Sequence, residues 1–248
     1  ALVMMGIKLR ETAHILNKPL RELCGPETPY HIVAVKRGED TVIPGGNDSL
    51  ELGDIAYFMT LRKHVQHILQ ITGKGDYGEV RHMMIMGGGL TTYHVIQDKP
   101  DSVSVKVIEQ SEERCRQFAD MLDDPDVSII QGDGRDTGML AEEGLRDMQA
   151  FAALTPYTET NILACLAAKR MGVRKTIAMV ENMDYVSLAE KLDIGTIINK
   201  KTIAASHIYQ MMLDTDVANV KCLTIANADV AEFIASEGSI VTEKPVRD

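Results

Sequence analysis

The sequence has few aromatic residues and no long apolar segment. Its 248 residues include no tryptophan, and aromatic side chains make up only 4% of the chain. No apolar run approaches the roughly 20 residues that a membrane-spanning helix requires, and no segment is typical of a signal peptide. We therefore expect a protein that is not inserted directly into a membrane.

Cysteine and basic charge are also scarce. The four cysteines lie far apart and form no C-x-x-C pair, which predicts reduced thiols rather than disulfides. Lysine and arginine total 26 against 36 aspartates and glutamates, so the formal net charge is −10. Nucleic-acid phosphates and anionic lipids repel such a chain, and we expect neither as a partner.

Two catalytic motifs are missing as well. No G-x-x-x-x-G-K-[ST] segment occurs, which argues against a P-loop hydrolase. None of the seven tyrosines has a lysine four positions later, so the Tyr-x-x-x-Lys pair of short-chain dehydrogenases is absent. His64 and His67 have a spacing that can pair metal ligands on a helix, but no third ligand is near them in the sequence. We expect neither catalytic residues nor a metal site.

The most informative segment runs from Arg81 to Gln110. It begins with an apolar run at 82–86 that is typical of a buried strand, followed by Gly87, Gly88 and Gly89. A short helix can follow, and a second apolar run at 103–108 ends on Glu109. Strand, glycine turn, helix, strand and acid follow one another in this order in a mononucleotide-binding βαβ unit.

The residue types suit that chemistry. Gly87 permits a tight turn, and Gly89 lets the backbone approach a pyrophosphate closely. The helix N-terminus that follows attracts anions, because it carries free N–H groups and a partial positive charge. Glu109 lies about 20 positions further on, where a carboxylate accepts hydrogen bonds from ribose hydroxyls. It would repel a 2′-phosphate, which favours NAD over NADP.

One position departs from the G-x-G-x-x-G pattern. The third glycine would fall at position 92, where the chain has Thr92. Because that glycine normally permits close packing between helix and strand, we expect the first helix to be displaced or irregular. Pro100 and Asp101 limit its length.

The region 82–200 alternates regularly between strand and helix patterns. Strand-like runs occupy six ranges, and helices that Ser111, Thr158 and Asn182 can cap lie between them. The six ranges are 82–86, 103–108, 127–131, 149–154, 175–180 and 195–199. This alternation predicts an α/β fold with a Rossmann-like, doubly wound parallel sheet over residues 82–214.

A smaller unit precedes that sheet. In residues 1–72 the strand-like runs cluster without regular helix alternation, which predicts a small α+β lobe. The segment 73–81 is rich in glycine and charged residues, which predicts a linker. Near the other end, the segment from Lys18 to Glu22 reappears as Lys244 to Asp248, which indicates a repeat in which residues 215–248 begin a second small lobe.

Together these segments resemble the TrkA-type regulatory subunits of bacterial potassium uptake systems, whose domains regulate the conductance of K⁺ (the RCK family). The markers in the small lobe are KPLREL at 18–23 and LELGDIAYF at 50–58. The markers in the large lobe are MIMGGG at 84–89, VIEQ at 107–110, QGDGRD at 131–136 and AALTPYTETNILACLAAKRMG at 152–172. The resemblance covers essentially the whole chain.

The resemblance implies a nucleotide site built from three strand ends. Glu109 matches the family's ribose acid, Asp133 its position beside the adenine ring, and Thr155 a threonine near the distal phosphate or nicotinamide. The residues implied in cofactor binding are Gly87, Gly88, Gly89, Leu90, Thr91, Glu109, Gln110, Gly132, Asp133, Gly134 and Thr155. The implied cofactor is NAD or NADH, with ATP or ADP as the alternatives. Met179 departs from the family, because many members carry an arginine there.

The implied function is that of a cytosolic regulatory subunit. It would bind an adenine nucleotide and gate a separate membrane K⁺ transporter by rearranging its lobes, at the inner face of the cell membrane. The apolar residues of the helix expected over 202–213 occupy much of its circumference, so the helix is either folded back on its own lobe or shared with a partner. The resemblance implies that it crosses to a second copy or to a tandem lobe. Three alternatives stay open: an NAD-dependent oxidoreductase, a degenerate lobe that serves only assembly, and a small lobe that itself binds a regulatory dinucleotide.

Overall fold

The structure is a computed structural model that describes residues 2–38, 40–75, 78–212, 217–222, 229–233, 235 and 237–243. The chain divides into two compact units. One comprises residues 78–203, and the other comprises residues 1–77 together with the described residues from Ala204 onward. The segment 244–248, which carries the sequence repeat of Lys18 to Glu22, lies outside the described residues.

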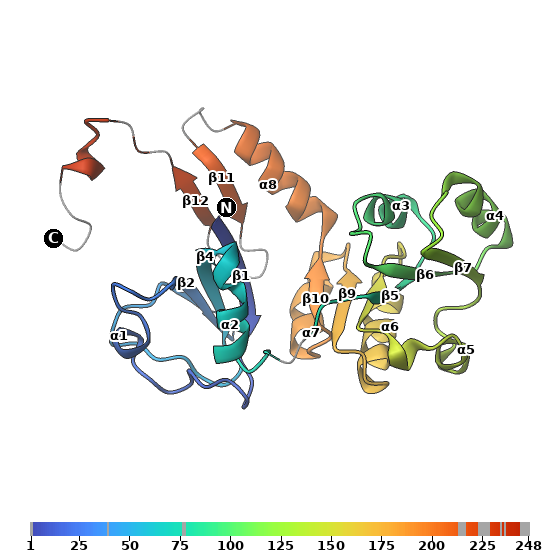
Figure 1. Ribbon diagram of the computed structural model, residues 1–248, viewed down its shortest axis with the longest axis horizontal. Helices are drawn as coiled ribbons and strands as arrows, with labels where there is room; N and C mark the ends of the chain where they lie inside the picture. The colour runs from blue at the N-terminus through green and yellow to red at the C-terminus, as the bar shows by residue number, and fades with distance from the viewer. Residues whose placement is uncertain are drawn as a thin grey trace. The chain divides into compact units, whose positions relative to one another are not determined.

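The unit 78–203 is built on a six-stranded parallel sheet (Figure 1). The strand order is β10-β9-β8-β5-β6-β7, so the chain starts near the middle of the sheet and winds outward twice. The strands are β5 (His82–Met86), β6 (Ser104–Glu109), β7 (Val127–Gln131), β8 (Ala150–Ala153), β9 (Lys175–Met179) and β10 (Thr196–Ile198). The predicted Rossmann-like, doubly wound sheet is therefore confirmed.

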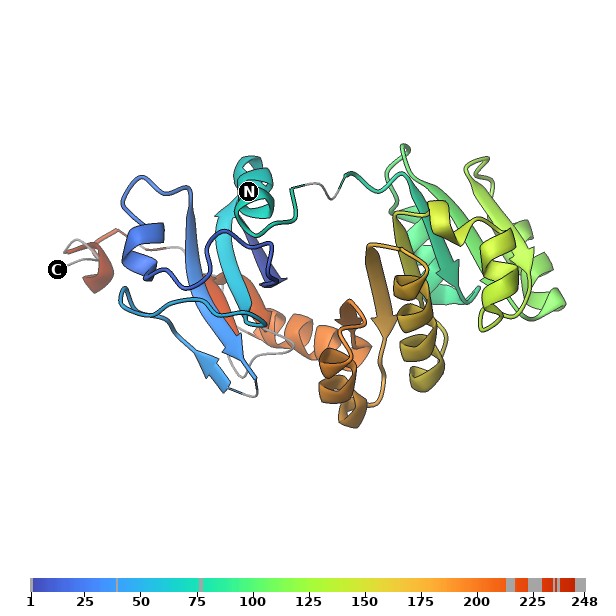
Figure 2. The same ribbon diagram turned by 90° about the horizontal axis from the view of Figure 1, so that it is seen from below.

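Helices cover both faces of this sheet (Figure 2). The α-helices are α3 (Leu90–Gln97), α4 (Glu112–Met121), α5 (Thr137–Glu142), α6 (Thr158–Arg170) and α7 (Val186–Lys191). Short 3₁₀ turns are η2 (Leu145–Asp147) and η3 (Met183–Tyr185). The long helix α8 (Lys200–Met212) leaves the sheet after β10.

Alternation along the strands creates two separate cores. In β5, the fully buried Met84 packs with side chains of α5 and α6, whereas its neighbour Ile85 packs with side chains of α3 and α4. Adjacent strand residues point to opposite faces, and both faces of a parallel sheet are covered by helices. This explains why these strands read as continuous apolar runs rather than as an alternating pattern.

The other unit contains a four-stranded antiparallel sheet in the order β1-β4-β2-β3. Its strands are β1 (Leu2–Lys8), β2 (Tyr30–Arg37), β3 (Asp40–Val42) and β4 (Ile55–Leu61), and its helical segments are α1 (Leu20–Leu23), η1 (Arg62–His64) and α2 (Val65–Ile71). The buried Asp54 accepts two hydrogen bonds from the guanidinium of Arg37, at 3.0 and 2.8 Å. This pairing ties the end of β2 to the turn before β4, and the small antiparallel sheet at the N-terminus agrees with the predicted α+β lobe.

A second, two-stranded antiparallel sheet lies in the C-terminal part of the chain. It consists of β11 (Val217–Cys222) and β12 (Asp229–Phe233), and the 3₁₀ turn η4 (Ile240–Thr242) follows it. Val230 of β12 packs against Ala34 and Tyr57 of the first sheet. Among the residues that the structure describes, no helix has both the length and the apolar character needed to span a membrane.

The predicted helix caps have a mixed outcome. The side chain of Ser111 caps α4 by accepting a hydrogen bond from the amide of Arg114, and Asn182 caps the turn η3 in the same way through Asp184. The prediction for Thr158 is wrong, because Thr158 is already the first residue of α6 and Tyr157 occupies the cap position. The Thr158 hydroxyl instead accepts hydrogen bonds from residues that follow β9.

The buried Cys165 on α6 predicts a loss of stability at high pH. Burial raises the pKa of its thiol from 9.0 to about 12. Because the folded-state pKa is the higher one, this contribution to stability is complete below the unfolded-state pKa and is lost as the pH rises toward the folded-state pKa. We expect the free energy of unfolding to fall by roughly 1 kcal/mol between about pH 8 and about pH 10.

Denaturant titrations followed by circular dichroism at the two pH values measure this fall. The variant Cys165→Ala lacks the titrating thiol and is the matched control. Between the same two pH values, the free energy of unfolding of this variant should fall by roughly 1 kcal/mol less than that of the parent chain. An equal fall in the variant and the parent chain would assign the pH dependence to other groups.

Candidate functional site

The predicted nucleotide site lies along one edge of the parallel sheet. Parallel strands place their carboxyl ends at the same edge, where open α/β sheets bind their ligands. The sequence-predicted residues therefore fall into three neighbouring groups, one after β5, one at the end of β6 and one after β7, with Thr155 two residues after the end of β8.

The turn after β5 depends on Gly87. Its backbone has φ of +107°, a conformation that residues with side chains rarely adopt. A Cβ atom at this position would lie only 3.2 Å from Cγ2 of Thr155 and 3.3 Å from the carbonyl carbon of Leu154. Two independent features therefore favour glycine at this position: its positive φ, and the close approach of the residues that follow β8.

Gly89 is different, because it lies open. It is the N-cap residue of α3, with φ of −100° and ψ of 178°, and a Cβ atom there would meet no atom within 4 Å. The backbone amides of the first helical turn follow at the exposed Leu90 and the half-buried Thr91. This open glycine at a helix N-terminus is the part of the turn that a phosphate can approach.

Thr92 compensates for the missing third glycine. Its side chain is fully buried, and its hydroxyl donates a 2.5 Å hydrogen bond to the carbonyl oxygen of Gly87. The threonine thus ties the first turn of α3 back to the glycine turn. α3 nevertheless forms a continuous α-helix of eight residues, so the expectation that this helix is irregular is wrong, whereas its displacement stays a prediction.

The carboxylate of Glu109 holds the same turn from the neighbouring strand. Glu109 is only 7% exposed. Its Oε2 accepts a hydrogen bond of 2.8 Å from the amide of Gly88, and its Oε1 accepts one of 2.8 Å from the amide of Ser111. Each carboxylate oxygen can accept a second hydrogen bond, so this arrangement leaves capacity for ribose hydroxyls. Gln110, the next residue, is exposed.

Asp133, in the loop after β7, pairs with its neighbour Arg135. The Arg135 guanidinium donates to both carboxylate oxygens, at 2.9, 3.1 and 2.7 Å, and the Arg135 amide donates to Oδ1. These hydrogen bonds hold the pKa of the Asp133 carboxyl below its ordinary value. Asp133 therefore stays charged and fixes a cation beside the predicted adenine position.

The two glycines that flank Asp133 allow close packing. A Cβ atom at Gly132 would lie 2.6 Å from Cε of Met139, and one at Gly134 would lie 2.4 Å from Cγ of Met86. Gly134 thereby lets the loop approach the end of β5, where the glycine turn begins.

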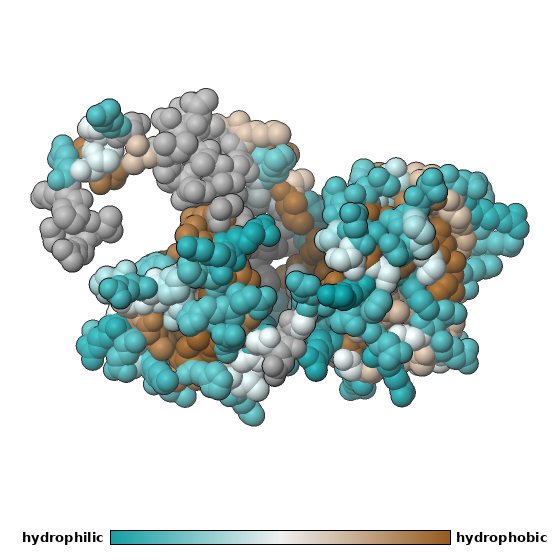
Figure 3. Space-filling view, in the orientation of Figure 1, coloured by the Kyte–Doolittle hydropathy of each residue, from teal (hydrophilic) through white to brown (hydrophobic). Residues whose placement is uncertain are grey.

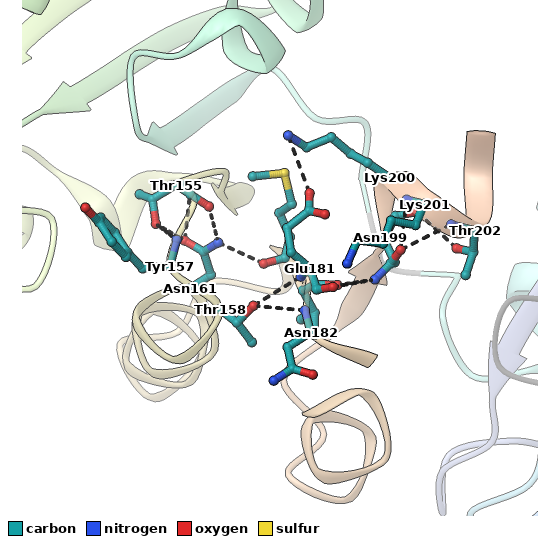
Figure 4. Close-up of polar contacts among 12 residues, drawn as sticks. Thr155, Tyr157, Thr158, Asn161, Glu181, Asn182, Asn199, Lys200, Lys201 and Thr202 are labelled. Carbon is teal, nitrogen blue, oxygen red and sulfur yellow. Dashed lines mark hydrogen bonds and ion pairs between the residues drawn. The ribbon is translucent and has the colours of Figure 1, made fainter. Parts of the chain in front are cut away.

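Thr155 belongs to a polar network that sequence reasoning missed (Figure 4). Its hydroxyl donates to Oδ1 of Asn161 at 2.6 Å, and its carbonyl oxygen accepts from Nδ2 of the same side chain at 2.7 Å. Asn161 and Asn199 are both fully buried and bind the segment that follows β9. The available signal was an asparagine directly before the apolar stretch 162–168 of α6, and another directly after β10.

Met179 occupies the position at which the resembled family often has an arginine. It ends β9 and is 2% exposed, in the apolar cluster that also contains Ile85 and Leu154. Its side chain is therefore part of the core. Arg135, which follows a different strand, supplies a cation that pairs with the predicted site residue Asp133.

The sequence comparisons define the family. Residues 4–73 match the family model of the TrkA-C domain, and residues 83–200 match that of the TrkA-N domain. The two matches together account for most of the chain and coincide with the small antiparallel sheet and the parallel sheet. The chain belongs to the TrkA family.

The relatives in this family are named for potassium uptake. The Trk system potassium uptake protein TrkA of Azorhizobium caulinodans is 29% identical over all of this chain and 55% of its own length. The TrkA homolog 2 of Methanosarcina mazei is 26% identical over 98% of this chain and 54% of its own length. The chain thus spans about half the length of the curated relatives that it matches.

Solved structures support the fold. The RCK domain of GsuK has a TM-score of 0.56 and 15% identity, over 89% of this chain and 48% of that chain. The GsuK channel bound to NAD has a TM-score of 0.52 and 14% identity, over 85% and 37% of the two chains. At these identities the similarity establishes an RCK-like fold.

The glycine turn yields a stability prediction. Gly87→Ala places a side chain at φ of +107° against the end of β8, and we expect it to lower the free energy of unfolding by about 1–3 kcal/mol. Gly89→Ser is the matched control, because its side chain has open space and serine is a favourable N-cap residue. Chemical denaturation compares both with the parent chain. If Gly87→Ala is as stable as Gly89→Ser, the turn does not need a glycine at position 87.

Proposed function

We propose that the unit 78–203 binds an adenine nucleotide, with NAD or NADH as the preferred ligand and ATP or ADP as the alternatives. The carrying observation is that the buried carboxylate of Glu109 accepts a hydrogen bond from Gly88, inside the glycine turn itself. This contact supports the proposal, because it holds a buried carboxylate beside an open helix N-terminus, at the sheet edge where such ligands bind.

The remaining predicted residues fit this ligand. The pyrophosphate would lie over Gly89 and the amides of Leu90 and Thr91, and the adenine ring near Asp133 and its partner Arg135. The distal part of the nucleotide would lie toward Thr155. The GsuK channel, which has a similar fold, has been solved bound to NAD, and this supports NAD as the first ligand to test.

The proposed role is regulation rather than catalysis. The relatives are named as Trk system potassium uptake proteins, and this supports a regulatory subunit of a K⁺ uptake system. In this proposal the nucleotide changes the arrangement of lobes and thereby gates a separate membrane K⁺ transporter, by as much as its affinity differs between the two arrangements. The protein would work in the cytoplasm, held at the inner face of the membrane by that transporter.

Calorimetric titration with a panel of nucleotides tests the binding site. We expect NAD⁺, NADH, ADP or ATP to bind, and NADP⁺ to bind at least about tenfold more weakly than NAD⁺, because Glu109 repels a 2′-phosphate. Gly89→Ser should retain the fold and weaken binding, because its side chain occupies the space that the phosphate needs. The absence of heat with every nucleotide, in a folded protein, would reject the site.

Glu109→Ala gives a second measurement at the same site. Loss of charge-assisted hydrogen bonds to the ribose should weaken binding by about 1.5–3 kcal/mol. Because Glu109 also holds the amides of Gly88 and Ser111, this variant is expected to lower stability as well, and Gly89→Ser provides the cleaner comparison.

We further propose that α8 is the surface through which the chain associates with a second copy or with a tandem lobe of a longer protein. Four apolar side chains of this helix are more than half exposed: Ile203, Ile208, Met211 and Met212. Hydrophobic side chains at the surface along α8 can be seen in the space-filling view (Figure 3). Covering each such side chain stabilises an assembly by roughly 1.5–3 kcal/mol.

Sedimentation velocity tests this association. We expect the 248-residue chain to associate and the double variant Ile208→Asp with Met212→Asp to be monomeric, because charges cannot be buried without partners. The pair Ile208→Leu with Met212→Leu keeps the surface apolar and should associate as the parent does. A parent chain that is monomeric, or a charged variant that keeps its assembly, contradicts the proposal.

A further inference from the structure

The segment that leaves β9, residues 179–182, is bound by buried side chains of α6 (Figure 4). Nδ2 of Asn161 donates to the carbonyl oxygen of Met179 at 2.8 Å. The Thr158 hydroxyl accepts from the amides of Glu181 and Asn182, at 3.1 and 3.4 Å. Both side chains of α6 are buried, Asn161 completely.

Asn199 binds the same segment from the side of α8. Its Nδ2 donates to the carbonyl oxygens of Val180 and Glu181, at 2.6 and 3.3 Å. Its Oδ1 accepts from the amides of Lys201 and Thr202, at 2.9 and 3.1 Å, and so caps the first turn of α8. One fully buried side chain therefore joins the segment after β9 to the start of α8.

Capping alone does not explain this asparagine. An N-cap requires only a side-chain oxygen, which serine, threonine or aspartate also provides. The two carbonyl oxygens on the other side require a donor, and the carboxamide supplies a donor and an acceptor together. Removing only the donor would leave buried carbonyl oxygens without this partner, while the cap remained intact.

The contacts form a continuous path from the glycine turn. Thr155 lies beside Gly87, close enough that a Cβ atom at Gly87 would touch its methyl group, and it is bound to Asn161 by three hydrogen bonds of 2.6–3.2 Å. Asn161 binds Met179, and the following residues bind Asn199. Each residue on this path is hydrogen-bonded or covalently linked to the next. A displacement of Thr155 is therefore passed on toward Asn199.

The path ends where the chain passes between its two units. α8 begins within the unit 78–203, and its residues from Ala204 onward group with the other unit. The chain also joins the two units at residues 77 and 78, before β5, but the first turn of α8 is the connection that follows the carboxyl end of a strand, and a change at that sheet edge can reach the other unit through it. Lys200, the first helical residue, also pairs with Glu181 at 3.4 Å.

We propose that Asn161 and Asn199 are positioning residues that couple the glycine turn to the first turn of α8, so that a ligand at the turn changes the stability of that helical turn. This inference rests on the proposed function for the identity of the ligand, but the coupling itself is a property of the hydrogen-bonded path. The hydrogen bonds described for both asparagines are made to protein atoms, and the role proposed for them is positioning.

Hydrogen exchange of α8, measured by mass spectrometry with and without NAD⁺ or ADP, tests the coupling. In the parent chain we expect nucleotide to change the exchange rate of the first turn by at least about fivefold. Asn199→Asp retains the cap and loses the donor. It should bind nucleotide within about threefold of the parent affinity, while the exchange of α8 no longer responds to the ligand.

Three comparisons separate coupling from a merely structural role. Asn199→Ser also keeps the cap without adding a charge, and it should behave as Asn199→Asp does. Ser111→Ala removes a helix cap elsewhere in the same unit and should leave the response of α8 unchanged. Thr155→Val, studied without ligand, should raise exchange in the first turn of α8 in the parent background and have no further effect in the Asn199→Asp background.

The outcomes distinguish the two proposals. If nucleotide binds and the exchange of α8 does not respond in the parent chain, the coupling is wrong and the proposed function stands. The coupling is also wrong if Asn199→Asp raises exchange but keeps the full response to ligand, because the asparagine is then only structural. If no nucleotide binds, the proposed function fails, and the Thr155→Val pair decides the coupling alone: additive effects overturn it.

Discussion

The hydrogen bond between the Gly88 amide and the Glu109 carboxylate is the contact on which the candidate site depends. It joins the ends of β5 and β6 at the point where the chain must turn away from the sheet. Gly87 makes the turn possible through its positive φ, and Thr92 holds the following helix against it. Since these groups are buried and bonded to one another, the open N-terminus of α3 is presented in one defined orientation before any ligand arrives.

The two halves of the sheet edge have different chemistry. The ends of β5, β6 and β7 carry the glycine turn, the buried acid and the Asp133–Arg135 pair, which are groups suited to a nucleotide. The ends of β8, β9 and β10 carry a network of buried amides and hydroxyls whose hydrogen bonds are made within the protein. In the proposed function the first half binds the ligand, whereas the hydrogen bonds of the second half hold neighbouring segments of the chain together. Thr155 belongs to both halves, because it contacts Gly87 and bonds to Asn161.

For the proposed regulatory function, this division of the sheet edge offers a physical route from the ligand to α8. A ligand can shift a conformational equilibrium only through contacts that differ between two arrangements. Here the contacts at the turn are continuous with the start of α8, the helix that leaves the unit. In the proposed association, the exposed apolar side chains of α8 would be the surface that contacts another lobe or another copy. Each step uses buried hydrogen bonds or apolar contact, and none requires a catalytic group.

The sequence by itself determined the order and type of the elements. Continuous apolar runs separated by amphipathic helices predict a parallel sheet, because local periodicity follows directly from which faces are buried. It also located the glycine turn, Glu109 and the cap at Ser111, since each is defined by neighbours within about 20 positions. Only the tertiary structure decided the roles of Thr92, Thr158, Asn161 and Asn199. Their partners are backbone carbonyl and amide groups in the glycine turn or in the segment at the end of β9. A hydrogen bond to a backbone group that folding brings close leaves no periodic signal in the sequence.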